Sequence, residues 1–273
     1  MTRIAVLSDV HGNLPAMEMV LTDIHAQVPD ATFHAGDMVN GPSSREILEL
    51  LRMESIPGVF GNHEEYVLNR PSVDSSAHEV EKFGSSAWTR AALPQADLRE
   101  IKAWPLVMNP VPGITIVHGS PTINGCRLAP ETTDAEVRAE FDAFDTPVVV
   151  AGHTHRTHVR KLDGRLFVNV GSAGRAIEGG GIATWGLFTR DSGSWDVEIR
   201  RVTFDTKRAL ADAIDSGWLE ASGGVGAAML HEITLGQRFT RGFSEWWDTR
   251  CPERPSVDAY RDYARATGVD PLV

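Results

Sequence analysis

The chain has 273 residues, of which 42% are hydrophobic and 23% are charged, and its formal net charge is -11. This composition excludes a disordered chain and allows one α/β domain, or a domain with an appendage, around a large core. The acidic balance disfavours stable nucleic-acid binding, which needs basic side chains to displace counterions. The sequence contains no uncharged apolar stretch of about 18 residues, so it predicts no membrane span.

Six short apolar runs, each ending at Gly, Asp, Asn or His, predict buried strands. In chain order they are RIAVLSD, ATFHAGD, IPGVFGN, GITIVHG, PVVVAGH and RLFVNVG. Open α/β sheets place their sites at the carboxyl ends of the strands. The sequence therefore predicts that polar side chains gather at one edge of the sheet.

Other patterns predict helices and a hairpin. Helical spacing of apolar residues predicts helices over 15–28 and over 44–53, the latter with Ser43 or Ser44 as N-cap. Two alternating runs joined at Ser192-Gly193 predict a β-hairpin.

We expect two domains. The core covers residues 1–204 and includes a polar, helical insertion at 64–105 as a partial cover over the site edge. Residues 205–273 have helix-like stretches and three tryptophans, which predicts a helical C-terminal appendage.

Asp9 and His11 follow the first run at positions i and i+2, which point the same way in extended backbone. A carboxylate and an imidazole that converge suit a borderline divalent ion such as Mn, Fe, Zn or Ni. Such a pair alone more often caps a helix or fills a turn. It is joined at other strand ends by Asp37, Asn62, His63, His118, His153 and His155. This ordered set predicts a metal centre, in which the two oxygens of Asp37 can bridge two ions.

The motifs SDVHGNLPAMEMVL, GDMVNGP, GNHE, VHGSP and GHTH together resemble the calcineurin-like metallophosphoesterase superfamily. Within it they resemble the small bacterial and archaeal branch described as phosphodiesterase-like or diadenosine-tetraphosphatase-like. The resemblance spans residues 8 to about 175 and implies a four-layer α-β-β-α sandwich of two mixed sheets flanked by helices.

The resemblance also implies roles for the site residues. The implied ligands are Asp9, His11 and His155 for the first ion, Asn62, His118 and His153 for the second, and Asp37 for both. His63 is implied to face the substrate and to assist the leaving group.

Two departures from the family pattern affect this interpretation. Relatives that act on phosphoproteins carry GD-x-x-DRG, whereas this chain has Asn40 and Gly41, which weakens a protein-phosphatase reading. Many relatives carry N-P-G-S after GHTH, where this chain has Val170 in place of proline.

We therefore expect a metal-dependent phosphodiesterase that hydrolyses a small phosphodiester or nucleotide by attack of a hydroxide bridging two divalent ions. Two such ions, two carboxylates and one hydroxide leave about one positive charge, which matches a phosphodiester. The alternatives are a phosphomonoesterase, a dinucleoside-polyphosphate hydrolase, or a non-catalytic scaffold like the retromer subunit that resembles this family. A nuclease is disfavoured by the acidic charge.

Mn is the expected metal, with Fe, Zn, Ni or Co as alternatives. Arg127, Arg156 and Arg175 are expected to be surface residues, and otherwise to contact the substrate. Cys126 and Cys251 lack the spacing of a zinc or redox motif, so both are expected to be free thiols. With no leader pattern at the start, the chain is expected to be cytoplasmic, without a membrane contact. The sequence leaves the oligomeric state open.

Overall fold

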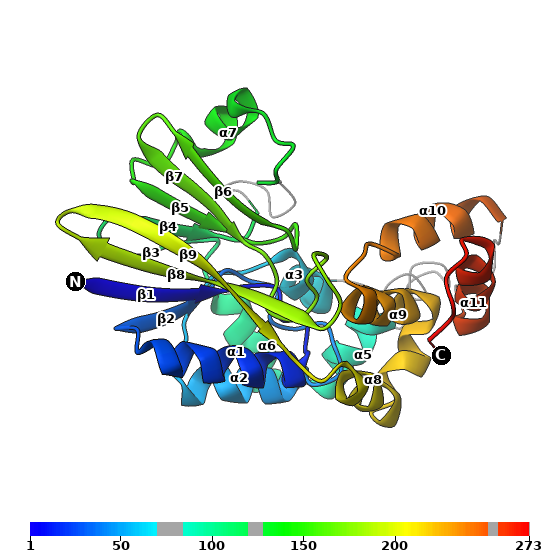
Figure 1. The fold of residues 1–273 in the computed structure, drawn as a ribbon. Helices are drawn as coiled ribbons and strands as arrows, with labels where there is room; N and C mark the ends of the chain where they lie inside the picture. The colour runs from blue at the N-terminus through cyan, green and yellow to red at the C-terminus, as the bar shows by residue number, and fades with distance from the viewer. Residues whose placement is uncertain (70–83, 120–127, 251–255, 273) are drawn as a thin grey trace.

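The computed structural model describes residues 1–69, 84–119, 128–250 and 256–272. The predicted free thiols Cys126 and Cys251 lie outside these residues, as does Arg127. Strands and helices are interspersed up to residue 203, and the described chain is helical from residue 206 onward (Figure 1).

The strands and helices have the following bounds. The strands are β1 (Thr2–Leu7), β2 (Ala31–His34), β3 (Val107–Val111), β4 (Ile114–Val117), β5 (Val148–Ala151), β6 (Thr157–Leu162), β7 (Arg165–Val170), β8 (Ile182–Asp191) and β9 (Ser194–Thr203). The helices are α1 (Leu14–Gln27), α2 (Ser44–Met53), α3 (Asn62–Asn69), α5 (Gly84–Ala92), α6 (Gln95–Ala103), α7 (Asp134–Phe141), α8 (Thr206–Asp215), α9 (Trp218–Leu235), α10 (Thr240–Arg250) and α11 (Val257–Ala266).

Two mixed sheets form the centre of the molecule. One has the strand order β2-β1-β8-β9 and the other has the order β3-β4-β5-β7-β6. β1 and β2 are parallel, and β5 is parallel to both β4 and β7. The carboxyl ends of parallel neighbours therefore lie at the same edge of each sheet.

Alternation of side chains across each strand builds the four layers. Ile4 and Val6 of β1 share a buried cluster with Ile116 of the second sheet. Leu7 faces the opposite side, where it packs with Met17 of α1 and other residues of the helices α1 and α2. A separate buried cluster joins the outer face of the second sheet to α7. The predicted α-β-β-α sandwich is confirmed.

The local predictions hold at α1, α2 and the hairpin. The side chain of Asn13 caps α1 by accepting the N–H of Ala16, at 3.2 Å. At α2, Ser43 occupies the cap position without a side-chain cap bond. β8 and β9 pair around Ser192 and Gly193, whose positive φ angles suit a tight hairpin turn.

The third apolar run, IPGVFGN, forms no strand of either sheet, so that prediction was wrong. Its backbone makes one isolated bridge, between Gly58 and His34. Pro57 has no N–H to donate to a neighbouring strand. The N–H of Phe60 turns away and donates to the carbonyl of Pro105, at 2.8 Å.

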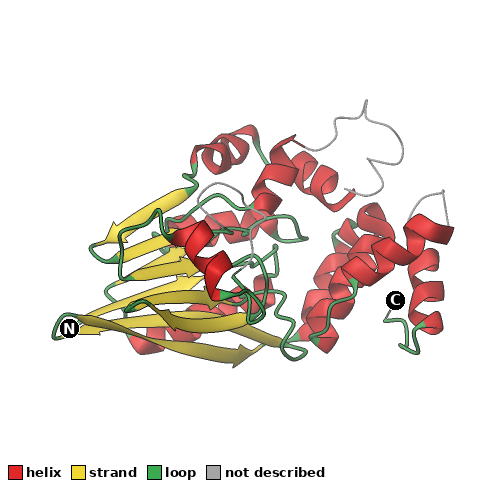
Figure 2. Ribbon diagram, turned by 90° about the horizontal axis from the view of Figure 1, so that it is seen from above, coloured by secondary structure: helices red, strands yellow, loops and turns green. Residues whose placement is uncertain are grey.

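Helices α8 to α11 lie beyond the carboxyl end of β1, beside the sheets (Figures 1 and 2). They have their own apolar cluster, which includes Trp218, Phe243 and Tyr260. The division into two domains at residue 204 stays a prediction, as does the covering role of the insertion at 64–105. Among the described residues, no helix combines the length and the apolar character that crossing a bilayer requires.

Candidate metal centre

The eight side chains predicted to act at the site lie in loops at the carboxyl ends of the strands or at the start of α3. Five of them have a left-handed backbone: Asp9 (φ 56), His11 (φ 51), Asp37 (φ 57), His153 (φ 70) and His155 (φ 58). This conformation is uncommon outside glycine and clusters at functional sites. Asp9 and His11 thus converge through a tight turn, and the expected strand-like alternation does not explain their meeting.

Backbone hydrogen bonds hold the loop after β1 against the loop after β2. The N–H of Asp9 donates to the carbonyl of Gly36 at 2.9 Å, and the N–H of His11 to that of Asp37 at 3.0 Å. A side chain at Gly41 would collide with the carbonyl oxygen of His11. This close approach leaves no room for the arginine that the DRG pattern carries at this position.

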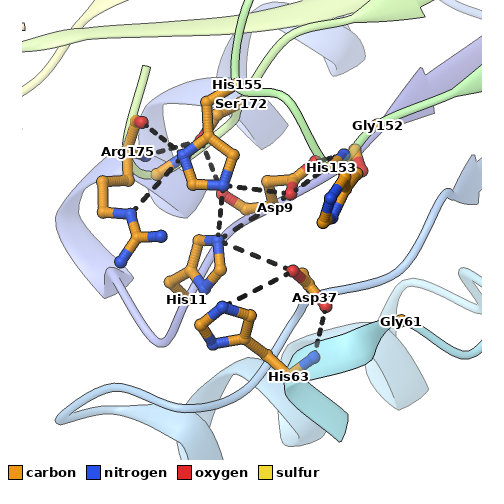
Figure 3. A network of polar contacts seen from close by, with 12 residues as sticks. Asp9, His11, Asp37, Gly61, His63, Gly152, His153, His155, Ser172 and Arg175 are labelled. Atoms are coloured by element: carbon orange, nitrogen blue, oxygen red, sulfur yellow. Dashed lines mark hydrogen bonds and ion pairs between the residues drawn. The ribbon is translucent and has the colours of Figure 1, made fainter. Parts of the chain in front are cut away.

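The first cluster consists of Asp9, His11 and His155 (Figure 3). His155 Nε2 lies 3.2 Å from Asp9 Oδ1 and 3.0 Å from His11 Nε2. His11 Nε2 lies 3.8 Å from Asp9 Oδ1. Two ligands on one ion, with bonds of about 2.1 Å, are at most about 4.2 Å apart. These three atoms therefore fit around a single cation.

The second cluster contains Asp37, His118 and His153, with Asn62 between the two rings. His118 Nε2 is 3.2 Å from Asp37 Oδ2 and 2.9 Å from Asn62 Oδ1. The same Asn62 oxygen is 2.8 Å from His153 Nδ1. Asp37 Oδ2 also lies 3.9 Å from His11 Nε2, so one carboxylate faces both clusters.

The donor atoms match the chemistry of a divalent cation. His118 Nδ1 lies 2.8 Å from the carbonyl of Ala35, and His155 Nδ1 lies 2.8 Å from that of Arg175. Each ring must donate its Nδ1 proton to that carbonyl, which directs the lone pair of Nε2 at the carboxylates. Such contacts from the second nitrogen are typical of metal-ligating histidines. Acceptors that face one another in this way are satisfied by a positive charge between them.

The pKa values of His118 and Asp37 also show that the second cluster favours a positive charge. Burial opposes protonation of His118, yet the charge of Asp37 raises the pKa of this imidazole to about 10. Burial raises the pKa of the Asp37 carboxyl, but the charges of His118 and His63 outweigh it and bring this pKa well below its usual range. In the second cluster, a proton on His118 therefore balances Asp37 when no cation does.

His63 stands beside the clusters and is held by Asn40. The side-chain N–H of Asn40 donates to His63 Nδ1 at 2.6 Å, and Asn40 Oδ1 accepts from the Ser86 hydroxyl of α5. His63 Nε2 lies 4.0 Å from Asp37 Oδ2. Burial lowers the pKa of His63 to about 3; the charge of Asp37 opposes this shift and that of Arg175 adds to it. The neutral ring consequently carries its proton on Nε2, the nitrogen near Asp37.

Glu64 is a site residue that the sequence analysis missed. Its buried carboxylate accepts four backbone N–H groups, those of Asp37, Met38, Val39 and Gly61, at 2.7 to 3.2 Å. It thereby ties the loop that carries Asp37 to the start of α3. The glutamate of GNHE was a visible signal, but nothing in the motif showed which backbone groups it would bind.

Replacing Glu64 by glutamine is expected to lower the free energy of unfolding of the metal-free protein by about 2–4 kcal/mol. The amide NH₂ would face buried N–H donors, and each one left unpaired costs about 1–3 kcal/mol. Urea unfolding measures the change. The neighbouring Glu65→Gln, at an exposed position of the same helix, is the control and is expected to shift the value by less than about 0.5 kcal/mol. Equal stability of both variants would contradict the anchoring role.

Arg175 is buried, so its expected place on the surface was wrong. The residue is 7% exposed, and its Nε lies 3.4 Å from the carboxylate of Glu232 in α9. Arg156 remains partly exposed and pairs with Glu131 at 2.8 Å. A helix distant in sequence therefore buries the arginine that follows the NVGSAG segment.

The structure thus brings together all eight predicted site residues: seven lie in the two groups that the family resemblance implied, and His63 lies beside His11 and Asp37. Their roles as ligands, and that of His63, stay predictions. The structure adds three residues to the predicted site: Glu64, Asn40, which fixes the tautomer of His63, and the buried Arg175.

Comparisons with known proteins agree with this geometry. A family model described as the calcineurin-like phosphoesterase superfamily domain matches residues 2–193. An uncharacterized protein of Methanocaldococcus jannaschii is 29% identical over 230 residues, covering 76% of this chain and 89% of that protein.

Two solved structures are similar as a whole. A metallophosphoesterase from Sphaerobacter thermophilus has 28% identity and a TM-score of 0.69, covering 86% of this chain and 99% of its own. A hypothetical protein from Pyrococcus horikoshii OT3, at 16% identity, shares the fold with a TM-score of 0.70. This match covers 87% of this chain and 100% of that protein's chain. Because 86% of 273 residues is about 235, the first match must include part of the region after residue 204.

Proposed function

The chain belongs to the calcineurin-like phosphoesterase superfamily, and from this we propose that it is a dinuclear metal-dependent phosphodiesterase acting on a small phosphodiester or nucleotide. The observation that carries the proposal is the position of the Asp37 carboxylate. Its Oδ2 is 3.2 Å from His118 and 3.9 Å from His11, one residue of each cluster. A carboxylate in that position suits two ions about 3.5–4 Å apart.

Two divalent cations in these clusters would supply positive charge for the phosphoryl oxygens and a water of lowered pKa as nucleophile. Asp9 and Asp37 neutralise two of the four charges, so the loaded centre attracts anionic esters. The ligand set contains nitrogen and oxygen but no thiolate, which suits Mn, Fe, Zn, Ni or Co, and we propose Mn. No serine or cysteine nucleophile is needed.

His63 is proposed to assist the leaving group. Asn40 donates to Nδ1 at 2.6 Å, so Nε2 keeps the ring proton. This N–H is near Asp37 and is able to donate to an oxygen of a substrate held at the centre. The ring is 12% exposed, which leaves an approach for substrate.

Removal and return of metal test the proposal. Protein stripped by a chelator is expected to lose hydrolysis of bis(p-nitrophenyl) phosphate, and Mn²⁺ is expected to restore it best among the candidate ions. Elemental analysis of the active protein should give two ions per chain. A panel of monoesters, diesters and nucleotides then ranks substrates by kcat/KM.

Two results would count against it. Full loading with two ions and no turnover of any ester would favour the alternative, a binding scaffold. Full activity with one ion per chain would refute the dinuclear centre.

A further inference from the structure

A cleft of about 310 Å³ opens beside the second cluster. Its walls include Asp37, His63, His153 and His155 of the centre. The remaining walls carry four arginines: Arg156, Arg175, Arg238 and Arg241. The volume is at the lower end of the range for small-molecule sites, about 300–1,000 Å³.

Two of these arginines come from the C-terminal helices. Arg238 lies in the link between α9 and α10, and Arg241 lies in the first turn of α10. Arg238 Nη2 donates to the carbonyl of Thr154 at 3.0 Å, between the predicted ligands His153 and His155. The appendage therefore reaches the metal centre itself.

Glu232 of α9 holds this arrangement in place. Its buried Oε1 accepts the N–H groups of Phe239 and Thr240, at 2.8 and 2.9 Å, which fixes the link that carries Arg238. Its Oε2 lies 3.4 Å from Arg175 Nε. One carboxylate thus positions arginines from both parts of the chain.

Arg175 has donor capacity that the protein does not use. Its Nη1 is buried and has no hydrogen-bond partner among the residues that the structure describes. A buried donor without an acceptor is costly, and a guanidinium matches phosphate oxygens in geometry. Arg175 lines the cleft, so its guanidinium adds positive charge to that wall.

The charges of the cleft are locally basic in an acidic protein. Beside the four arginines, the lining carboxylates are Asp37, which faces both predicted metal clusters, and Glu131. Glu131 pairs with Arg156, whose side chain is 39% exposed, and Glu245 pairs with Arg241, which is 66% exposed. Exposed pairs of this kind are weak, so an anion competes with them readily.

On the premise of the phosphoesterase function above, we propose that these arginines bind a second phosphate of the substrate. The substrate class is then a phosphate ester with at least two linked phosphates, such as a nucleoside polyphosphate. In the reaction, the oxygen of a water molecule would bond to one phosphorus of the substrate as the bond from that phosphorus to the leaving oxygen breaks; the water would lose a proton to solvent, and the leaving oxygen would take one from His63 Nε2. The second phosphate stays unreacted on the arginines.

Calorimetry on the Mn²⁺-loaded protein tests the site. The probes are adenosine 5′-monophosphate and its α,β-methylene diphosphate analogue, which resists cleavage between its phosphorus atoms, at equal free Mn²⁺. Wild type is expected to bind the diphosphate analogue about tenfold or more tightly than the monophosphate. The double variant Arg238→Gln and Arg241→Gln is expected to reduce this preference to less than about threefold.

Arg265→Gln is the matched control, because this α11 arginine pairs with Asp262 and is not among the residues that line the cleft. It should keep the wild-type preference. Equal affinity of wild type for both probes, or an unchanged preference in the double variant, would overturn the proposal. Because binding is read without turnover, a protein that prefers the diphosphate but hydrolyses no ester would refute the proposed function and leave the arginine site standing.

Discussion

Asp37→Asn is expected to remove at least one cation from the centre and to lower kcat/KM for phosphate esters by about 10³-fold or more. The amide keeps the shape and tolerates the left-handed backbone of this residue, φ 57. It removes the charge that faces both His118 and His11. Metal ions contribute several kcal/mol to transition-state stabilisation, and about 4 kcal/mol corresponds to a factor of 10³. Elemental analysis after dialysis and steady-state kinetics measure the two effects.

Asp163→Asn is the control for this change. Asp163 also has a left-handed backbone, φ 52, but its carboxylate is exposed and pairs with Arg138 at the surface. Its replacement is expected to change kcat/KM by less than about twofold. If Asp37→Asn retains two ions and near wild-type turnover, the shared carboxylate is not essential and the proposed centre is wrong.

The site could be predicted because six of its eight residues follow the carboxyl ends of β1, β2, β4 and β5, while Asn62 and His63 follow an apolar run that forms no strand. Each strand contributes only one or two polar residues, and their order along the chain matches the family pattern. The backbone conformation was less predictable. Asp9 and His11 meet through left-handed turns, held by bonds to the loop after β2, which no local pattern revealed.

The two edge strands of the second sheet, β3 and β6, gave weak signals. β3 contains Pro110, which disfavours a central strand but is tolerated at an edge, and β3 is the terminal strand of its sheet. β6, at the other edge, is mostly polar and only partly buried. Neither has the buried apolar run by which the central strands were found.

The contacts between the core and the appendage lie beyond sequence reasoning. Arg175 looked like a surface residue because its partner, Glu232, is far away along the chain. The position of Arg238 depends on how α9 turns into α10 and on the same glutamate. The sequence shows that these residues are positively charged. Their positions at the cleft, which give them their proposed role, depend on tertiary packing.

His63→Ala is expected to keep both cations and to lower turnover of esters with poor leaving groups by about 10²–10⁴-fold. His63 also groups with His11 and Asp37, but it belongs neither to the cluster of Asp9, His11 and His155 nor to that of Asp37, His118 and His153, so its loss leaves those six side chains intact. Proton donation to a leaving group contributes a factor of this size. In esters of p-nitrophenol, the leaving group departs as the stable p-nitrophenolate anion and needs less help from a proton donor. The loss should therefore grow as the pKa of the leaving alcohol rises, which a series of aryl and alkyl diesters measures.

His25→Ala provides the control, since His25 is exposed, pairs with Glu54 and is not among the residues that line the cleft. It should leave both the turnover and its dependence on the leaving group unchanged. The dependence is the decisive observation, because a merely structural role of His63 would lower the rate of all esters by the same factor. A uniform loss, or equal activity on alkyl esters, would show that the N–H fixed by Asn40 does not serve the leaving oxygen.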